Sequence, residues 1–514
     1  MSRLTFFCDL AEATTPLPHF WEHTIGSDHA RAALRSDWQR QLKRAHDELG
    51  FRYVRFHGLL SDDMGTLRRH NGELVYSFFN CDQIFDFLLT IGMKPFVELS
   101  FMPTALASGK RTVFSYEGNV TPPKDYKEWA TLIKSLVSHL VDRYGEREVS
   151  SWFFEVWNEP NLKKFWSGNQ RDYFKLYRQT AEAIKSVSPS LKVGGPATAK
   201  SEWVEEFVDF CDRNDVACDF VSTHYYPNDG FERDGDVEQQ LFKSQRGIMR
   251  EVAQNTRRRS RGKPVYYTEW NSSSVPSDPL RDEPYAAGFV GSTILEANRL
   301  VDGYSFWTFS DIFEENYFPS KPFHGGFGLL TLHGIPKPSY RAFELFYELG
   351  ERQSLVDGLH ETVDCSLVQK DSSVTLLLTN HTTPGHSIET EELHIRLDNA
   401  SEPTGARIQR IDEDHANPKR LWQEMGEPEY LSEKDLERLE EASQLVSEKQ
   451  SISFDEGSIS LHVSLLAHAV AAITIDFKAS LECGGLAPLL PRSSAIDNKA
   501  APGRRSPRRR PLPK

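Results

Sequence analysis

The sequence predicts an α/β fold: a (β/α)8 TIM barrel with an accessory antiparallel β-sandwich domain. Strand-like and helix-like segments alternate from about residue 21 to residue 345. After about residue 350 the apolar residues recur with a period of two. The structural alternative is a doubly wound open sheet, which would normally show a glycine-rich phosphate-binding turn after an early strand. The sequence contains no such turn.

Eight short strands are expected in the first part of the chain. Each is β-branched or aromatic and is bounded by glycine, proline or polar residues, and several are almost continuously apolar, as buried parallel strands are. They are the segments 23–27, 53–58, 94–101, 151–159, 192–196, 220–226, 264–271 and 303–311. The clearest helix runs from Lys124 to Tyr144, where large apolar side chains recur every three or four residues, and Asp125 is placed to cap it.

The short segments after about residue 350, in which apolar residues alternate, predict the strands of the sandwich. A charged segment at 431–445 predicts a helical insertion in it. We expect four regions. Residues 1–20 form an N-terminal segment that could pair with the sandwich, 21–345 form the barrel and 346–478 form the sandwich. Residues 479–514 form a basic tail rich in proline and arginine, which offers few apolar residues to bury and is expected to be disordered.

Composition and charge narrow the class of protein. Of the 514 residues, 39% are hydrophobic and 11% aromatic, which is enough for a large core and excludes a globally disordered chain. No apolar run approaches the roughly 20 residues that span a bilayer, so we expect no membrane partner. The net charge is −14, and the last 36 residues carry eight Lys/Arg and two Asp/Glu, so the preceding 478 carry −20. This acidic body argues against a nucleic-acid partner, because phosphate binding needs clustered Lys and Arg.

The N-terminus and the cysteines bear on the location of the protein. The first sixteen residues hold one arginine and an apolar patch too short for the core of a signal peptide. The six cysteines, at positions 8, 81, 211, 218, 365 and 483, are widely spaced without a Cys-x-x-Cys pair, which is typical of reduced thiols. We therefore expect a cytoplasmic protein.

Two glutamates stand at the ends of predicted strands. Glu159 lies in W-N-E-P-N at the fourth strand, and Glu269 lies in Y-Y-T-E-W-N at the seventh. The C-terminal ends of barrel strands converge on one mouth, where barrel enzymes place their chemistry. Two carboxylates across such a pocket can cleave a glycosidic bond, because one protonates the leaving oxygen while the other attacks or activates water. The Asn158 amide is placed to bind a sugar 2-hydroxyl, which fits a retaining mechanism.

The sequence resembles glycoside hydrolase family 39, particularly its bacterial β-xylosidases. The resemblance keeps its order and spacing from about residue 20 to residue 477. It rests on segments that include YVRFHGLLSDDMG (53–65), IGMKPFVELSFMPTALASG (91–109), FFEVWNEPNLKKFW (153–166) and FHGGFGLLTLHGIPKPSY (323–340). It implies a retaining, exo-acting β-D-xylosidase that hydrolyses xylo-oligosaccharides and aryl β-xylosides through a covalent glycosyl-enzyme intermediate. Glu159 would be the general acid/base and Glu269 the nucleophile, with carboxyl groups about 5–5.5 Å apart and no cofactor or metal.

The resemblance also implies a set of substrate-binding residues. They are His57, Phe114, Asn158, Phe165, His224, Tyr226, Trp307, Glu314 and Glu315. Trp307 is expected to form the floor on which the pyranose stacks, because a flat apolar ring matches the C–H face of a sugar. Glu314 and Glu315 are expected to accept hydrogen bonds from sugar hydroxyls. Arg55 is expected to be the partner of a catalytic carboxylate, and Tyr226 to reach Glu269.

Other substrates and one other class of protein stay open. An α-L-iduronidase of the same family would need cations near the carboxylate of its sugar, and the strand-end motifs offer only Arg55. A β-glucosidase would differ mainly in pocket size, which discriminates modestly, and an α-L-arabinopyranosidase is a further possibility. A non-catalytic carbohydrate-binding protein would normally lack one of the two glutamates. Members of the family can be tetrameric, so a homo-oligomer (tetramer or dimer) also stays open.

Overall fold

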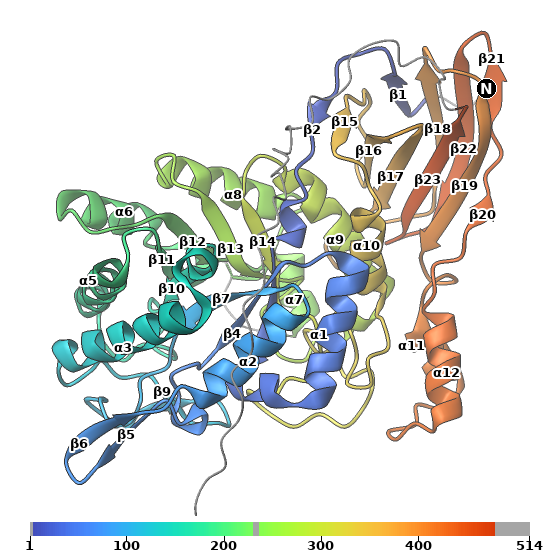
Figure 1. The fold of residues 1–514 in the computed structure, drawn as a ribbon. Helices are drawn as coiled ribbons and strands as arrows, with labels where there is room; N and C mark the ends of the chain where they lie inside the picture. Colours follow the sequence, from blue (N-terminus) through green and yellow to red (C-terminus); the bar gives the residue numbers. More distant parts are fainter. Residues whose placement is uncertain (1–3, 230–235, 479–514) are drawn as a thin grey trace, which may run out of the picture. The chain divides into compact units, whose positions relative to one another are not determined.

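The computed structural model describes residues 4–229 and 236–478, and its first part is a closed barrel of parallel strands (Figure 1). In chain order the barrel strands are β3 (Thr24–His29), β4 (Tyr53–His57), β7 (Lys94–Leu99), β10 (Phe153–Val156), β11 (Lys192–Thr198), β12 (Phe220–His224), β13 (Val265–Trp270) and β14 (Gly303–Phe306). Each strand pairs with the next one along the chain, and β14 closes the barrel on β3. Every strand overlaps one of the predicted segments, so the predicted barrel is confirmed.

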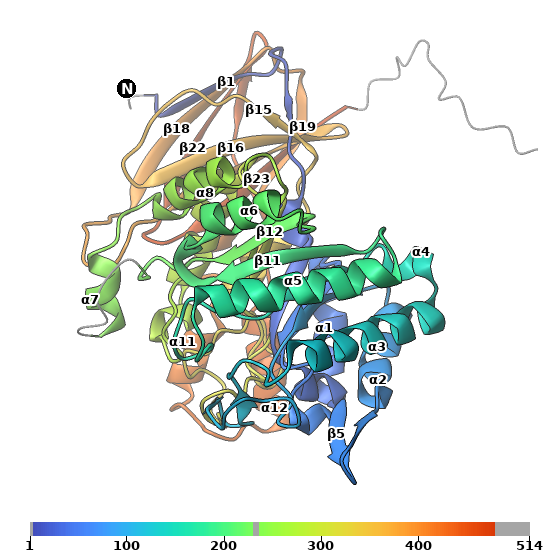
Figure 2. The same ribbon diagram turned by 90° about the vertical axis from the view of Figure 1, so that its left-hand side faces the viewer.

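A helix follows each barrel strand. These helices are α1 (Ser36–Leu49), α2 (Phe79–Thr90), α3 (Tyr126–Tyr144), α5 (Gln170–Val187), α6 (Val204–Arg213), α8 (Ile248–Arg259), α9 (Pro284–Ala297) and α10 (Pro338–Tyr347). Helices α3 and α5 lie side by side in Figure 2 and are in contact. The side chain of Asp125 accepts a hydrogen bond from the amide of Lys127, which confirms the predicted cap of α3. Within the described residues, no helix combines the length and the apolar character that crossing a bilayer requires.

Shorter elements fill the barrel loops. Two are helices, α4 (Glu146–Val149) and α7 (Val237–Phe242), and two are hairpins, β5 (Leu67–His70) with β6 (Glu73–Tyr76) and β8 (Thr112–Val113) with β9 (Gly118–Asn119). Single 3-10 turns occur at η1 (Phe20–Glu22), η2 (Ala30–Leu34), η3 (Asp62–Met64), η4 (Ala199–Ser201) and η5 (Pro279–Asp282). The turn η4 follows β11 directly and belongs to the mouth of the barrel.

The second part of the chain forms two sheets together with two strands from the N-terminus. One contains β1 (Phe6–Asp9), β18 (Glu391–Asp398), β22 (Ser458–Leu465) and β21 (Ser453–Asp455). The other contains β2 (Thr15–Pro16), β15 (Arg352–Ser354), β16 (Val363–Lys370), β17 (Ser373–Asn380), β23 (Val470–Phe477), β19 (Pro403–Ile411) and β20 (Glu448–Lys449). Their longer strands pair antiparallel, whereas β1 joins β18 in parallel. The N-terminal strands β1 and β2 therefore lie in the sandwich sheets.

The sandwich carries two helices and touches the barrel. The predicted insertion is α12 (Glu433–Ala442), while α11 (Pro418–Glu424) is an additional helix that the period-two pattern does not indicate. Leu377 and Val470 of the sandwich belong to the same apolar cluster as the barrel core. Trp422 of α11 packs against Phe323 of the loop after β14. The predictions for the tail, residues 479–514, lie outside the described residues.

The interior of the barrel is layered. Tyr53, Phe96, Phe153, Phe220 and Tyr266 form an aromatic cluster near the N-terminal ends of their strands. Two residues further along the same strands stand Arg55, Glu98, Glu155, Ser222 and Thr268. Because residues i and i+2 of a strand face the same side, these polar side chains form the next layer above the aromatic one. The barrel thus passes from an apolar end to a polar end within two residues.

Candidate active site

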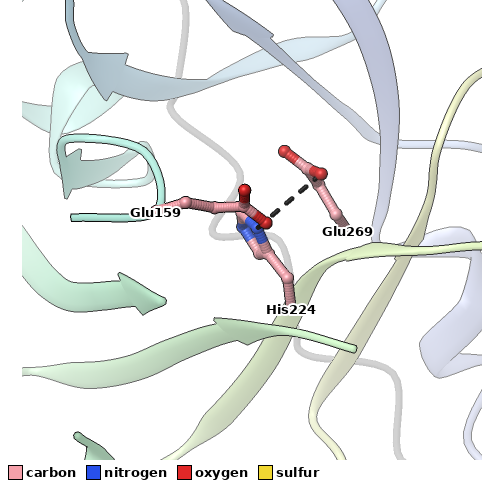
Figure 3. Close-up of side chains that lie close together, drawn as sticks. All are labelled: Glu159, His224 and Glu269. Carbon is pink, nitrogen blue, oxygen red and sulfur yellow. Dashed lines mark hydrogen bonds and ion pairs between the residues drawn. The ribbon is translucent and has the colours of Figure 1, made fainter. Parts of the chain in front are cut away.

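Two acidic side chains meet at the C-terminal end of the barrel. Glu159 lies three residues beyond β10, and Glu269 is the fifth residue of β13. One carboxylate oxygen of each lies with a ring nitrogen of His224 in a group whose members are all within 4.8 Å of one another (Figure 3). All three side chains are buried. The structure therefore brings together the two glutamates that the strand-end argument pairs.

The chain fixes Glu159 by a sharp turn after β10. Trp157 and Glu159 have φ angles of 75° and 44°, in the left-handed region that costs a non-glycine residue energy. The amide of Glu159 donates to the carbonyl of Ala197 at 2.8 Å. The side chain of Asn161 bonds to both the amide and the carbonyl of Ala199, each at 3.0 Å. These bonds tie the loop after β10 to the end of β11 and the turn η4.

A single buried guanidinium organises the acids of the polar layer. Arg55 contacts Glu155 at 2.6 Å, Glu98 at 2.7 Å and Glu269 at 2.9 Å. Its Nη2 also donates to the side-chain oxygen of Asn158 at 3.0 Å. Burial lowers the pKa of Arg55, but the surrounding carboxylates outweigh that effect and raise it. The predicted role of Arg55 as a carboxylate partner agrees with these contacts.

The second oxygen of Glu269 has its own hydrogen-bond donor. The hydroxyl of Tyr226 donates to it at 2.9 Å, as expected from the sequence. Burial and the neighbouring Glu269 hold the pKa of Tyr226 well above its ordinary value, so the phenol keeps its proton. Glu269 thus lies between a cation and a fixed hydroxyl, each of which donates a hydrogen bond to one of its oxygens.

His224 lies beneath the two glutamates. Its Nδ1 is 3.0 Å from a carboxylate oxygen of Glu159, and its Nε2 is 3.1 Å from the hydroxyl of Thr268. That hydroxyl donates in turn to Glu155 at 2.8 Å. Burial lowers the pKa of His224 to about 4, so the ring is neutral at neutral pH. The glutamates and this ring form one connected polar chain.

The two glutamates open onto a cavity of about 360 Å³. Of the predicted residues, those that line it are His57, Phe114, Asn158, Glu159, Phe165, Tyr226, Glu269, Trp307 and Glu315. Nδ1 of His57 is 2.7 Å from Glu98, and its Nε2 is 3.4 Å from Glu315. Burial lowers the pKa of His57 to about 3, and burial together with Asp28 raises the pKa of Glu315 well above its ordinary value. A neutral imidazole and a carboxyl therefore face the cavity as hydrogen-bonding groups.

Aromatic rings form the cavity walls. Trp307 is buried, its ring centroid lies 4.7 Å from that of His57, and the guanidinium of Arg55 lies 5.9 Å from it. Phe114 and Phe165 contact each other with centroids 5.4 Å apart. Such flat apolar faces suit the C–H face of a sugar ring.

Two of the predicted residues lie elsewhere. His224 is fully buried and reaches the glutamates from below rather than lining the cavity. Glu314 is not among the lining residues either, because its carboxylate pairs with Arg35 on the outer side of the loop. Its amide donates to Asp28 at 3.0 Å, which fixes the loop that carries Glu315. The structure thus separates the adjacent acids: Glu315 faces the cavity and Glu314 does not.

Several residues of the site are not indicated by the strand-end motifs. Glu98 and Glu155 hold Arg55 and His57 from within β7 and β10. A charged residue inside an otherwise apolar buried strand is a usable signal, because it is tolerated only when paired. Lys163, Lys164 and Lys200 line the cavity from loops just beyond the strand-end motifs. Their position depends on loop geometry, which strand periodicity does not fix.

Glu159, His224 and Glu269 could each present one ligand atom to a metal ion. The arrangement does not fit that use. The Arg55 guanidinium is bonded to Glu269 at 2.9 Å, so a metal cation there would meet a second positive charge that is already fixed. Tyr226 occupies the other oxygen of the same carboxylate.

A (β/α)8 barrel with two buried carboxylates at the C-terminal ends of different strands, beside a cavity walled by aromatic rings, defines a glycoside hydrolase. Comparison with known proteins gives the family. The sequence profile of Glycosyl hydrolases family 39 matches residues 7–459, and the chain belongs to this family.

Individual relatives cover nearly the whole chain. A β-xylosidase of Caldicellulosiruptor saccharolyticus is 51% identical over 463 residues, covering 89% of this chain and 95% of its own. A β-xylosidase of Geobacillus stearothermophilus is 39% identical, covering 89% of this chain and 92% of its own. The solved structure of a GH39 β-xylosidase from Caulobacter crescentus superposes with a TM-score of 0.78 at 34% identity, covering 92% of this chain and 100% of its own. The superposed Caulobacter structure shares the fold of this chain over both the barrel and the β-rich accessory domain.

Proposed function

We propose that the protein is a retaining, exo-acting β-D-xylosidase, with Glu159 as general acid/base and Glu269 as nucleophile. The observation that carries the proposal is the contrast between the partners of the two carboxylates. Glu269 receives a charged and a neutral donor, from Arg55 and Tyr226. Glu159 contacts a neutral histidine. The β-xylosidases that are similar along nearly the whole chain support the substrate class.

His224 connects Glu159 to the polar layer. Its Nε2 lies 3.1 Å from the hydroxyl of Thr268 and 3.4 Å from Nη2 of Arg55, which also donates to Asn158. Its Nδ1 lies 3.0 Å from Glu159 Oε1, a distance at which the ring and the carboxyl share one hydrogen. In the proposed reaction Glu159 enters as the acid, beside a neutral ring rather than beside a cation.

The reaction then proceeds in two balanced steps. The ionised Glu269 attacks the anomeric carbon while Glu159 passes its proton to the glycosidic oxygen, so the C–O bond breaks and the leaving alcohol departs. In the second step Glu159, now a carboxylate, takes a proton from water. The water oxygen bonds to the anomeric carbon, and Glu269 leaves as a carboxylate. Two displacements at the same carbon preserve its configuration.

The separation of the acids favours this mechanism over inversion. One oxygen of each glutamate lies in a group whose members are all within 4.8 Å. Retaining enzymes have carboxyl groups about 5–5.5 Å apart, whereas inverting enzymes need about 6.5–9.5 Å to admit a water. Burial of both acids beside a cavity of about 360 Å³ fits removal of single terminal sugars.

The groups around the inner cavity favour a neutral sugar. His57 and Glu315 offer hydrogen bonds to hydroxyls, and the carboxyl of Glu315 would not attract a uronic acid carboxylate. Arg55 is already bonded to three carboxylates, so it has no free charge for a fourth. This argues against an α-L-iduronidase, while a β-glucosidase remains the closer alternative because it differs by one hydroxymethyl group.

Substitution of the nucleophile tests the mechanism. Glu269→Ala is expected to abolish turnover of an aryl β-D-xyloside, and added azide is expected to restore turnover and yield a product of inverted anomeric configuration, followed by NMR. Full activity of Glu269→Ala without azide would refute the assignment. A panel of aryl glycosides run with the same wild-type preparation tests the sugar preference.

Substitution of the acid has a different signature. Glu159→Ala is expected to lose activity severely with poor leaving groups and mildly with activated ones, because only the former need protonation. The measurement is kcat/KM across aryl xylosides of graded leaving-group acidity. Equal losses for all of them would reject the acid/base role.

A further inference from the structure

Three lysines stand at the mouth of the cavity in an otherwise acidic protein. Lys163, Lys164 and Lys200 line the same cavity as Glu159, and all three are exposed to solvent. The chain carries a net charge of −14, so the general field of the protein disfavours anionic ligands. These three lysines place positive charge beside the reacting groups of an otherwise acidic protein.

The lysines lie on the loops that hold Glu159. Lys163 and Lys164 follow Glu159 in the loop after β10, and Lys200 is the middle residue of η4, after β11. Asn161 cross-links these two loops through its bonds to Ala199. Glu269 and Glu315, in contrast, come from β13 and from the loop after β14. The cluster is therefore a fixed part of the Glu159 side of the cavity.

The three ammonium groups keep free donors. Lys163 donates one hydrogen bond to the carbonyl of Gly168 at 2.7 Å, and an ammonium has three N–H donors. Lys164 lies over the rings of Phe114 and Phe165, 4.9 and 5.1 Å from their centroids. Within residues 4–229 and 236–478, none of the three lysines forms an ion pair with a carboxylate. Their charge is thus available to a ligand, and two of them are already held in place.

We propose that these lysines form a leaving-group subsite for a carboxylate, so that the preferred substrates are xylosides whose leaving group carries an acidic substituent, such as a uronic-acid-substituted xylo-oligosaccharide. This inference rests on the proposed function and deepens it. Uronic acids are the sugars that bring a carboxylate to an otherwise neutral oligosaccharide. A carboxylate accepts hydrogen bonds from several ammonium groups at once.

The position of the cluster assigns it to the leaving group rather than to the terminal sugar. Glu159 delivers its proton to the oxygen of the leaving group, so the loops that flank Glu159 are those nearest to that group. His57, Trp307 and Glu315 line the cavity from β4 and from the chain after β14, and no cavity-lining lysine of the described residues belongs to those segments. A carboxylate on the terminal sugar would instead face Glu315.

The test compares two aryl β-D-xylosides of matched leaving-group chemistry, 4-(carboxymethyl)phenyl and its neutral amide, 4-(carbamoylmethyl)phenyl. We expect the wild-type kcat/KM ratio of acid to amide to be about 5 to 10, the size expected of two or three exposed ion pairs. The ratio should fall towards one as salt is raised, because exposed charges are screened. In K163Q/K164Q/K200Q the ratio should be about one at low salt. The matched control is Lys134→Gln, an exposed lysine on α3, which should keep the wild-type ratio.

The outcomes are separable. If neither xyloside is hydrolysed, the proposed function fails. If both are hydrolysed with a wild-type ratio near one at low salt, only the subsite is refuted, and this holds even if the triple variant does not fold. An aryl β-D-glucuronide and an aryl α-L-iduronide form a second arm. Hydrolysis of either that is lost in the triple variant would place the lysines against the terminal sugar and overturn the assignment.

Discussion

The two ends of the barrel interior are built from the same strands but follow opposite rules. At the N-terminal end, Phe96 and Phe153 stack with centroids 5.0 Å apart, and further rings pack edge-on around them. Two residues along, Glu98 and Glu155 share Arg55. The aromatic end is held mainly by packing, with one hydrogen bond from the Tyr53 hydroxyl to the carbonyl of Ser151 at 3.0 Å. The polar end is satisfied only when every charge finds its partner.

Because of this difference, the aromatic end mainly stabilises the fold, and the polar end mainly positions the reacting groups. An aromatic layer tolerates no water and needs no exact donor geometry, so it seals the barrel below the site. The polar layer gives up hydration free energy, and only specific contacts offset that cost. In return it fixes Glu269 next to a cation and Glu159 next to a neutral ring. Each end can be perturbed separately.

The largest effect is expected from Arg55→Met at the polar end. The substitution leaves three buried carboxylates without their cation, so the free energy of unfolding should fall by about 4 kcal/mol. We expect kcat/KM for an aryl β-xyloside to fall by about 1000-fold, because Glu269 loses its charged donor. Urea unfolding and steady-state kinetics measure both, with the exposed Arg258→Met as control. If Arg55→Met is as stable as the wild type, the buried carboxylates do not depend on this cation.

Phe153→Ala probes the aromatic end. Removal of this buried ring leaves a cavity in the sealed layer and should lower the free energy of unfolding by about 3–4 kcal/mol. Because the glutamates keep their partners, kcat/KM per folded molecule should stay within about threefold. The control is Phe318→Ala, whose side chain is 72% exposed. A loss of activity comparable to that of Arg55→Met would show that the two ends are not separable.

His29 gives the polar end a pH dependence. Burial lowers the pKa of His29, but Asp28 at 2.9 Å and Asp63 at 3.4 Å raise it to about 9. A folded-state pKa above the unfolded value of about 6.5 gives stability that is complete below pH 6.5 and is lost as the pH rises through 9, about 3 kcal/mol in all. The difference in unfolding free energy between wild type and His29→Gln should thus shrink from pH 6 to pH 10. A difference that is constant with pH would contradict the charged state of His29.

The smallest effect is expected from Glu314→Gln. The pair with Arg35 is partly exposed, so its loss should cost less than about 1 kcal/mol of stability and change kcat/KM less than about twofold. Glu315→Gln, one residue on, should lower kcat/KM by about 100-fold, because its carboxyl faces the cavity. Steady-state kinetics with an aryl β-xyloside compares the two. Equal losses of kcat/KM in Glu314→Gln and Glu315→Gln would show that Glu314 also acts in the site.

The sequence predicts more of the fold than of the site. Apolar runs and their spacing locate all eight barrel strands, because burial on both faces leaves a continuous hydrophobic signal. Strand ends also locate Glu159 and Glu269. The short helix α11 escapes prediction, because seven residues are too few to show a helical period.

Within the site, residues that are adjacent in the sequence can face different surroundings when they lie in a loop. Glu314 and Glu315 are neighbours with the same side chain, and only the path of the loop sends one to Arg35 and the other to the cavity. Lys163, Lys164 and Lys200 belong to no strand-end motif, and the bonds of Asn161 bring their loops together. No periodicity encodes these positions.

By itself the sequence determined the barrel, the sandwich and the two glutamates, since periodic burial and the convergence of parallel strand ends are local rules repeated along the chain. The tertiary structure alone decided that Arg55 pairs with three acids and that Nδ1 of His224 lies 3.0 Å from Glu159. It also decided that three lysines face the mouth of the cavity. The reason is physical: charge pairing in a buried site depends on distances of a few ångströms between strands far apart in the chain, and only the closed barrel sets those distances.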